Sequence, residues 1–127
     1  MAVFDRQWVA SANHVLRNHR TGAVREFAVT LHLAFDDPAH PDCGVAALAG
    51  RQQFLPHVGR QADVVARVPY DLAARAFEHD DQTLFMNEVL SSGALWLEGD
   101  MAKARFFLRG LVRNATPETV QALRGIG

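Results

Sequence analysis

The chain has 127 residues, of which 49% are hydrophobic and 21% are charged, as in an ordinary globular protein. Its formal net charge is −1, so no excess of positive charge draws it to nucleic acid or to an anionic membrane. Cys43 is the only cysteine, which excludes an internal disulfide, and no run of about 18 apolar residues predicts a membrane span. We therefore expect one domain over residues 1–127 that contacts membranes at most transiently.

The ends of the sequence carry no recognisable targeting signal. The N-terminus lacks a basic region followed by an apolar run, and the final Gly125-Ile126-Gly127 differs from the peroxisomal Ser-Lys-Leu. The expected compartment is the cytoplasm, where a single unpaired cysteine is ordinary.

The first predicted element is a helix over Phe4–Asn18. Its apolar residues recur three to four positions apart, and Asp5 lies in the first turn, where a negative charge is favoured. We expect Phe4 and Trp8 to pack in the core rather than to close over a ligand.

The next segment, Val24–Phe35, is the clearest strand in the sequence. Alternate positions are large and apolar, which indicates one buried face and one partly solvated face. The buried face is expected to carry Phe27, Val29, Leu31, Leu33 and Phe35. Further strands are predicted over Val45–Ala49, Gln52–Leu55 and Ala62–Val68, and the absence of a long helix between them suggests a meander.

The loop at 36–44 gathers the only residues that resemble a metal-binding cluster. They are Asp36, Asp37, His40, Asp42 and Cys43. Zinc sites need repeated Cys or His ligands at regular spacing, and the loop has one of each. We interpret it as a solvated hairpin loop and expect neither a metal nor a cofactor.

The second half of the chain predicts three helix starts. Tyr70–Glu78 is expected to be a short helix, and Asp81 is placed to cap another that continues to about Leu90. Leu84, Phe85 and Val89 are expected to point inward from that helix. Thr116-Pro117-Glu118 gives an N-cap, a proline at the first helical position and an acid in the first turn of the last helix.

A strand, a turn and a helix follow one another within Ser91–Leu108. Leu95 and Leu97 alternate with less buried positions, Gly99 permits an unusual backbone angle, and Asp100 is a natural N-cap. The following helix has an apolar stripe of Met101, Ala104, Leu108 and Leu111, widened by Phe107. The strands and helices come in separate runs, which predicts an α+β fold with a largely antiparallel sheet covered on one side.

The run GALWLEGDMAKA over 93–104 resembles the C-terminal signature of the sterol carrier protein type 2 (SCP2) family. Ala62–Val68 resembles that family's Ala-Asp-Val-x-hydrophobic strand, and the resemblance extends over residues 62–111. It implies a stand-alone, bacterial-type member with a five-stranded mixed sheet and helices that enclose an apolar tunnel. The implied function is non-catalytic carriage of a fatty acyl, sterol-like or isoprenoid lipid.

The apolar residues around the last strand would line such a tunnel, although the sequence alone does not distinguish a hollow core from a filled one. The expected lining residues are Phe27, Leu31, Leu84, Phe85, Leu95, Leu97, Met101, Phe107, Leu108 and Leu111.

Three alternatives stay open. One branch of the family assists ubiquinone biosynthesis, and Asp81–Phe85 together with Leu97–Asp100 looks similar to it. A solid-core homodimer could use Phe106 and the arginines of the same helix, Arg105, Arg109 and Arg113. An enzyme using His40 and Cys43 carries the least weight, because no phosphate-binding or serine-hydrolase motif is present. The expected partner is a hydrophobic small molecule, with a homodimer or a lipid-using enzyme as further possibilities.

Overall fold

The computed structural model describes residues 2–18, 28–48, 51–55, 62–114 and 116–126. Its elements are α1 (Arg6–Asn18), β1 (Ala28–Ala34), β2 (Cys43–Leu48), β3 (Arg51–Leu55), β4 (Val64–Arg67), α2 (Tyr70–Ala74), the 3₁₀ helix η1 (Ala76–Glu78), α3 (Gln82–Ser92), β5 (Trp96–Gly99), α4 (Met101–Asn114) and α5 (Pro117–Arg124). The predicted α+β class is confirmed.

The strands form one mixed sheet in the order β3-β2-β1-β4-β5. β1, β2 and β3 are antiparallel neighbours, β4 runs parallel to β1, and β5 is antiparallel to β4. The five-stranded mixed sheet is therefore confirmed, whereas the meander of the first four strands is wrong. β4 joins the other edge of β1, where Thr30 and Asp63 exchange two hydrogen bonds of 2.9 and 3.0 Å.

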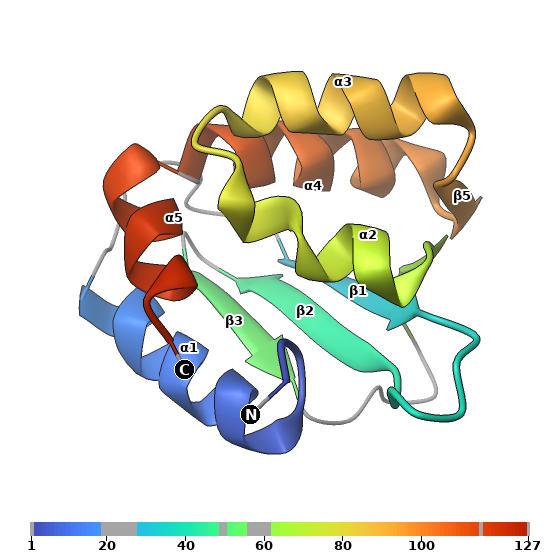
Figure 1. Ribbon diagram of the computed structural model, residues 1–127. Coiled ribbons are helices and arrows are strands. Elements are labelled where there is room, and N and C mark those ends of the chain that lie inside the picture. Colours follow the sequence, from blue (N-terminus) through green and yellow to red (C-terminus); the bar gives the residue numbers. More distant parts are fainter. Residues whose placement is uncertain (1, 19–27, 49–50, 56–61, 115, 127) are drawn as a thin grey trace.

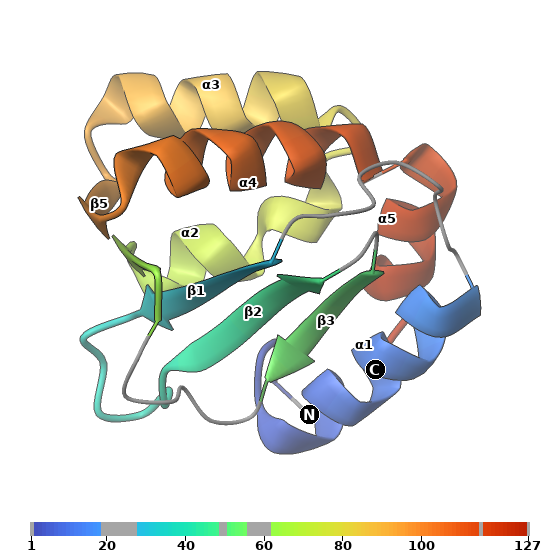
Figure 2. The same ribbon diagram turned by 180° about the vertical axis from the view of Figure 1, so that it is seen from behind.

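The helices lie over one face of the sheet and beside its β3 edge (Figures 1 and 2). α1 packs against β3, α5 against α1 and η1, and α4 against β4 and β5. On β1, Val29 and Leu31 are buried, whereas Thr30 and His32 on the opposite face are only half-buried. The alternation is that of a sheet with one covered and one partly solvated face.

Side-chain caps begin the helices where the sequence predicts them. Each cap accepts a hydrogen bond from the backbone N–H three residues on: Asp81 from Leu84 (3.0 Å), Asp100 from Lys103 (3.1 Å) and Thr116 from Thr119 (3.3 Å). α1 begins later than predicted, at Arg6, because Phe4 has φ +69° and Asp5 itself accepts from the Trp8 N–H at 2.8 Å.

Two predicted elements differ in extent. The helix expected over Tyr70–Glu78 is divided into α2 and η1 at Arg75. The strand expected over Val24–Phe35 is observed as Ala28–Ala34, and its first four residues lie outside the described part of the chain. Within the described ranges, no helix combines the length and the apolar character needed to cross a bilayer.

Asp63 joins β1, β4, β5 and α4. Besides its bonds to Thr30, its backbone carbonyl accepts a hydrogen bond from the Asp100 N–H at 3.0 Å. Its carboxylate forms an ion pair with Lys103 Nζ, also at 3.0 Å. Gly99 has φ +111°, and a Cβ there would collide with the Asp63 carbonyl oxygen. The turn into α4 therefore requires glycine at 99 for both its angle and its close approach.

Candidate functional site

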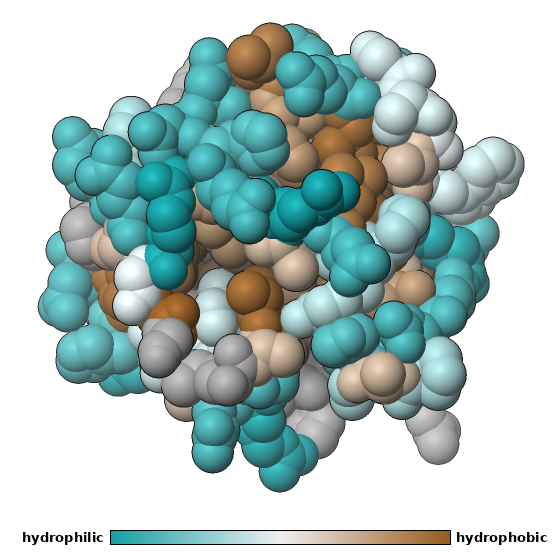
Figure 3. Space-filling model, in the orientation of Figure 1, coloured by the Kyte–Doolittle hydropathy of each residue, from teal (hydrophilic) through white to brown (hydrophobic). Residues whose placement is uncertain are grey.

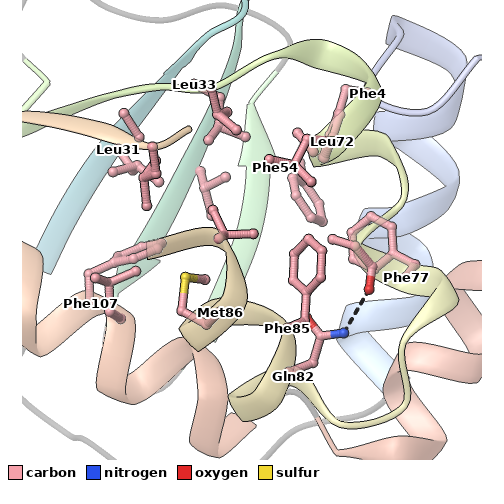
Figure 4. Close-up of a pocket in the computed structure, with 18 of the residues that line it drawn as sticks. Phe4, Leu31, Leu33, Phe54, Leu72, Phe77, Gln82, Phe85, Met86 and Phe107 are labelled. Carbon is pink, nitrogen blue, oxygen red and sulfur yellow. Dashed lines mark hydrogen bonds between the residues drawn. The ribbon is translucent and has the colours of Figure 1, made fainter. Parts of the chain in front are cut away.

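A cavity of about 160 Å³ lies between the covered face of the sheet and the helices (Figure 4). All five strands or their immediate flanks contribute to its wall, together with α1, α2, η1, α3, α4 and α5. The sheet side includes Leu31, Leu33, Val45, Phe54, Val64 and Ala66. The helix side includes Leu72, Phe77, Phe85, Met86, Phe107 and Leu108.

The cavity wall is almost entirely apolar. Among its described residues, only Gln82 and Thr119 have polar side chains, and none carries a charge. A ligand's hydrocarbon binds favourably against such a wall because binding removes it from water, and the wall offers few directional contacts.

Six of the ten residues predicted to line a tunnel stand in this wall. Leu31 comes from β1, Phe85 from α3, and the other four are Leu95, Leu97, Phe107 and Leu108. The structure therefore brings together residues from both halves of the chain, and their contact with a ligand stays a prediction.

The other four predicted residues are not placed in the wall. Leu84 and Met101 are 57% and 42% exposed; Leu84 lies in the first turn of α3, and Met101 is the first residue of α4. Phe27 lies outside the described residues, and Leu111 lies in α4 with its side chain outside the description.

Sequence reasoning omitted several wall residues from the predicted site. Leu33 lies on the same predicted face as Leu31, and Leu72 and Phe77 belong to a helix expected to face the core, so these three could have been found. Phe54 reaches the cavity because β3 pairs with β2, and the sequence gives no direct signal for that placement.

Next to the cavity, the predicted core packing of Phe4 and Trp8 is confirmed. Trp8 is 1% exposed, and its ring centroid lies 5.1 Å from that of Phe4, 5.0 Å from Phe54 and 5.5 Å from Phe77. These rings close the end of the cavity nearest α1, with Phe4, Phe54 and Phe77 also bordering the empty space.

On the face seen in Figure 3, apolar side chains show between hydrophilic ones below α3. Leu84 and Leu90, both on α3, are among the large hydrophobic residues that are exposed. The helix therefore places apolar residues on its outer side as well as over the cavity.

The loop between β1 and β2 does not assemble a reactive centre. Asp42 pairs with His32 at 2.7 Å and Asp36 with Arg67 at 3.1 Å, and no group of three or more possible metal ligands occurs among the described residues. Cys43 is buried at the start of β2, and burial raises the pKa of its thiol to about 12. A thiol that stays protonated is a poor nucleophile at neutral pH.

Solved structures with the same fold include several SCP2 proteins. A crystal structure of sterol carrier protein 2 has a TM-score of 0.60 at 19% identity, covering 98% of this chain and 99% of that one. A structure described as UbiJ-SCP2 ubiquinone synthesis protein has a TM-score of 0.57 at 15% identity, covering 84% and 88%. Palmitated SCP2L2 from Aedes aegypti has a TM-score of 0.53 at 17% identity, covering 86% and 93%.

The search by sequence gives no match to a protein-family model or to a curated protein. The structural likeness confirms the SCP2-like fold that the motifs at 62–111 predict.

Proposed function

We propose that this protein binds and carries a hydrophobic small molecule, with a fatty acyl, sterol-like or isoprenoid body, in the cavity beneath α3 and α4. The observation that carries the proposal is the cavity of about 160 Å³ with its nearly continuous apolar wall. The shared fold with sterol carrier protein 2 and with the palmitated mosquito protein supports it. The role requires no chemical step, and no catalytic residue is assigned.

The size of the cavity sets what it accepts without rearrangement. An apolar protein cavity of about 150 Å³ binds benzene, so a ring or a short chain fits here directly. A longer chain must either part the helices or extend to the surface. Six buried CH₂ groups would contribute about 5 kcal/mol towards binding, before the cost of ordering the ligand.

Native mass spectrometry of the freshly purified protein, followed by organic extraction, tests the proposal. We expect a bound species of defined mass that is released on denaturation. Met86→Trp should abolish binding because Met86 points into the cavity between Phe85 and Phe107 (Figure 4). Leu84→Trp is the matched control, since it adds the same ring to the exposed side of the same helix.

An unliganded mass, with no uptake of added lipid by the folded protein, would contradict the carrier function. The same spectrum reports a homodimer directly, which is the form expected of an interaction domain without a ligand. Equal binding by wild type, Met86→Trp and Leu84→Trp would place the ligand elsewhere on the protein.

A role in ubiquinone biosynthesis is the second candidate, favoured by the likeness to the UbiJ-SCP2 structure. A quinone or its precursor has one ring and an isoprenoid tail, and the cavity as observed has room for the ring. Extraction separates the two candidates, because quinones absorb in the ultraviolet and saturated acyl chains do not. A lipid-using enzyme would be the partner in either case.

A further inference from the structure

The two polar side chains of the cavity wall come from elements that meet at one end of the cavity. Gln82 begins α3, and Thr119 lies in the first turn of α5. Arg124 of α5 donates to the Phe77 carbonyl at 2.7 Å and to Asp80 at 2.6 Å, which ties α5 to η1 and to the start of α3. Figures 1 and 2 both show α5 beside this junction.

The orientation of the Gln82 amide follows from its neighbours. Its nitrogen Nε2 donates to the carbonyl oxygens of Ala76 (2.8 Å) and His79 (2.6 Å), and Figure 4 shows the first of these bonds beside Phe77. Both neighbours only accept, so the NH₂ group must face them and both of its hydrogens are used. Among the described residues, the amide oxygen Oε1 has no hydrogen-bond donor. Gln82 therefore keeps an oriented acceptor at the cavity wall.

Thr119 contributes a second polar group. Its side chain is almost fully buried, with 4% of the residue exposed, and its hydroxyl lies 3.0 Å from the hydroxyl of Thr116. A hydroxyl has one donor and two acceptor positions. One bond to Thr116 therefore leaves Thr119 able to pair with a further polar group.

The charges around this end disfavour an anion. Asp80 and Asp81 precede α3, and Glu118 lies in the first turn of α5, so each helix start already has a carboxylate beside it. Arg124 is paired with Asp80. An ionised headgroup at the wall would therefore face the Gln82 oxygen, with no cation among the described wall residues.

We infer that the ligand is an uncharged lipid bearing a hydroxyl group, which donates to Gln82 Oε1 and pairs with Thr119 Oγ1 where η1, α3 and α5 meet. This inference rests on the proposed function and narrows it from any hydrophobic molecule to a neutral alcohol. A free fatty acid, ionised at neutral pH, is the disfavoured ligand.

Calorimetric titration of the full chain tests this inference with three probes that share a long unbranched alkyl chain: dodecan-1-ol, 1-methoxyundecane and dodecanoate. The ether keeps an oxygen but has no hydrogen to donate, and the carboxylate adds the charge. We expect the alcohol to bind about three- to ten-fold more tightly than either, which is what one hydrogen bond contributes. Gln82→Met should bring the alcohol-to-ether ratio close to one, and Thr119→Val should reduce it.

Gln121→Met and Thr83→Val make the same chemical changes at exposed positions of α5 and α3 and should leave the ratio unchanged. The alcohol-to-ether ratio compares two ligands in the same variant. A general loosening of that variant's structure weakens both affinities and therefore cancels in the ratio. Dodecanoate binding as tightly as the alcohol, or a ratio unchanged in Gln82→Met and Thr119→Val, would overturn this inference and leave the carrier function standing. Failure of all three probes to bind the folded wild type would overturn both this inference and the carrier function.

Discussion

The two ends of the covered sheet face differ in how they are filled. Near α1, the rings of Phe4, Trp8, Phe35, Phe54 and Phe77 interlock, with centroids 5.0 to 6.0 Å apart. Beneath α3 and α4, aliphatic side chains such as Leu31, Val64 and Met86 border a cavity, together with Phe85 and Phe107. We call these two regions the aromatic end and the cavity region. The comparison shows that one sheet face supports both closely packed rings and a cavity, according to how side chains from distant segments meet across it.

Each region is also held by one carboxylate. Asp5 accepts from the N–H groups of Ala2 and Trp8 at 2.9 and 2.8 Å, which fixes the start of α1 at the aromatic end. Beside the cavity region, the Asp63 carboxylate accepts a hydrogen bond from the Thr30 N–H of β1 and forms an ion pair with Lys103 of α4. The difference between the regions therefore lies in packing, since the polar anchoring is similar.

The largest effect is expected at the aromatic end. Trp8→Ala should lower the free energy of unfolding by about 3–5 kcal/mol, because it removes the most buried large ring and leaves a void that its neighbours cannot fill. Denaturant unfolding followed by circular dichroism measures this. A loss below about 1 kcal/mol would mean that the aromatic end is not a solid core.

A smaller loss is expected when the polar anchor of the cavity region is removed. Asp63→Ala should cost about 1–3 kcal/mol, because the Thr30 N–H loses its acceptor and Lys103 loses its ion partner. Glu88→Ala, at an exposed position of α3, is the control and should stay within about 0.5 kcal/mol of wild type. An equal loss of unfolding free energy in the two variants would show that Asp63 does not anchor the cavity region.

Acid should weaken both regions over the same range. The pKa of Asp5 is lowered mainly by the hydrogen bond from the Trp8 N–H, and that of Asp63 mainly by the bond from the Thr30 N–H and then by Lys103. A carboxyl with a lowered folded pKa adds stability above its unfolded pKa, and this is lost as the pH falls through the folded value. We expect urea midpoints to fall below about pH 3.8, the ordinary value. The fall should be shallower in Asp63→Ala, and an equal slope would be evidence against the lowered pKa.

The smallest effect is expected inside the cavity region. Truncation of a methionine in a filled core costs about 2–5 kcal/mol, but Met86 already borders empty space, so Met86→Ala should cost less than about 1 kcal/mol. Comparison with Trp8→Ala in one denaturation series sharpens the contrast between the regions. A cost of about 2 kcal/mol or more would show that the cavity region is filled in solution.

Local patterns predicted most of the elements but only part of the cavity wall. Helix caps and turn glycines act within a few residues, so the sequence pattern predicts them directly. The examples here are the caps Asp81, Asp100 and Thr116 and the glycine at 99. Leu31 and Phe107, each on a clear apolar face, border the cavity, and their contact with a ligand stays a prediction. Leu84 and Met101 are exposed instead, and an apolar residue next to a helix cap carries no signal for which side of the helix it takes.

The sequence by itself determined the α+β order, the helix starts and the strand-turn-helix at 93–104, because these depend on residues close together in the chain. Only the tertiary structure decided that β4 pairs with β1, that Phe54 and Phe77 meet Trp8, and that Gln82 and Thr119 both border the cavity. Empty space within a core depends on how side chains from distant segments meet. No local pattern of hydrophobic residues distinguishes a wall around a cavity from a filled core.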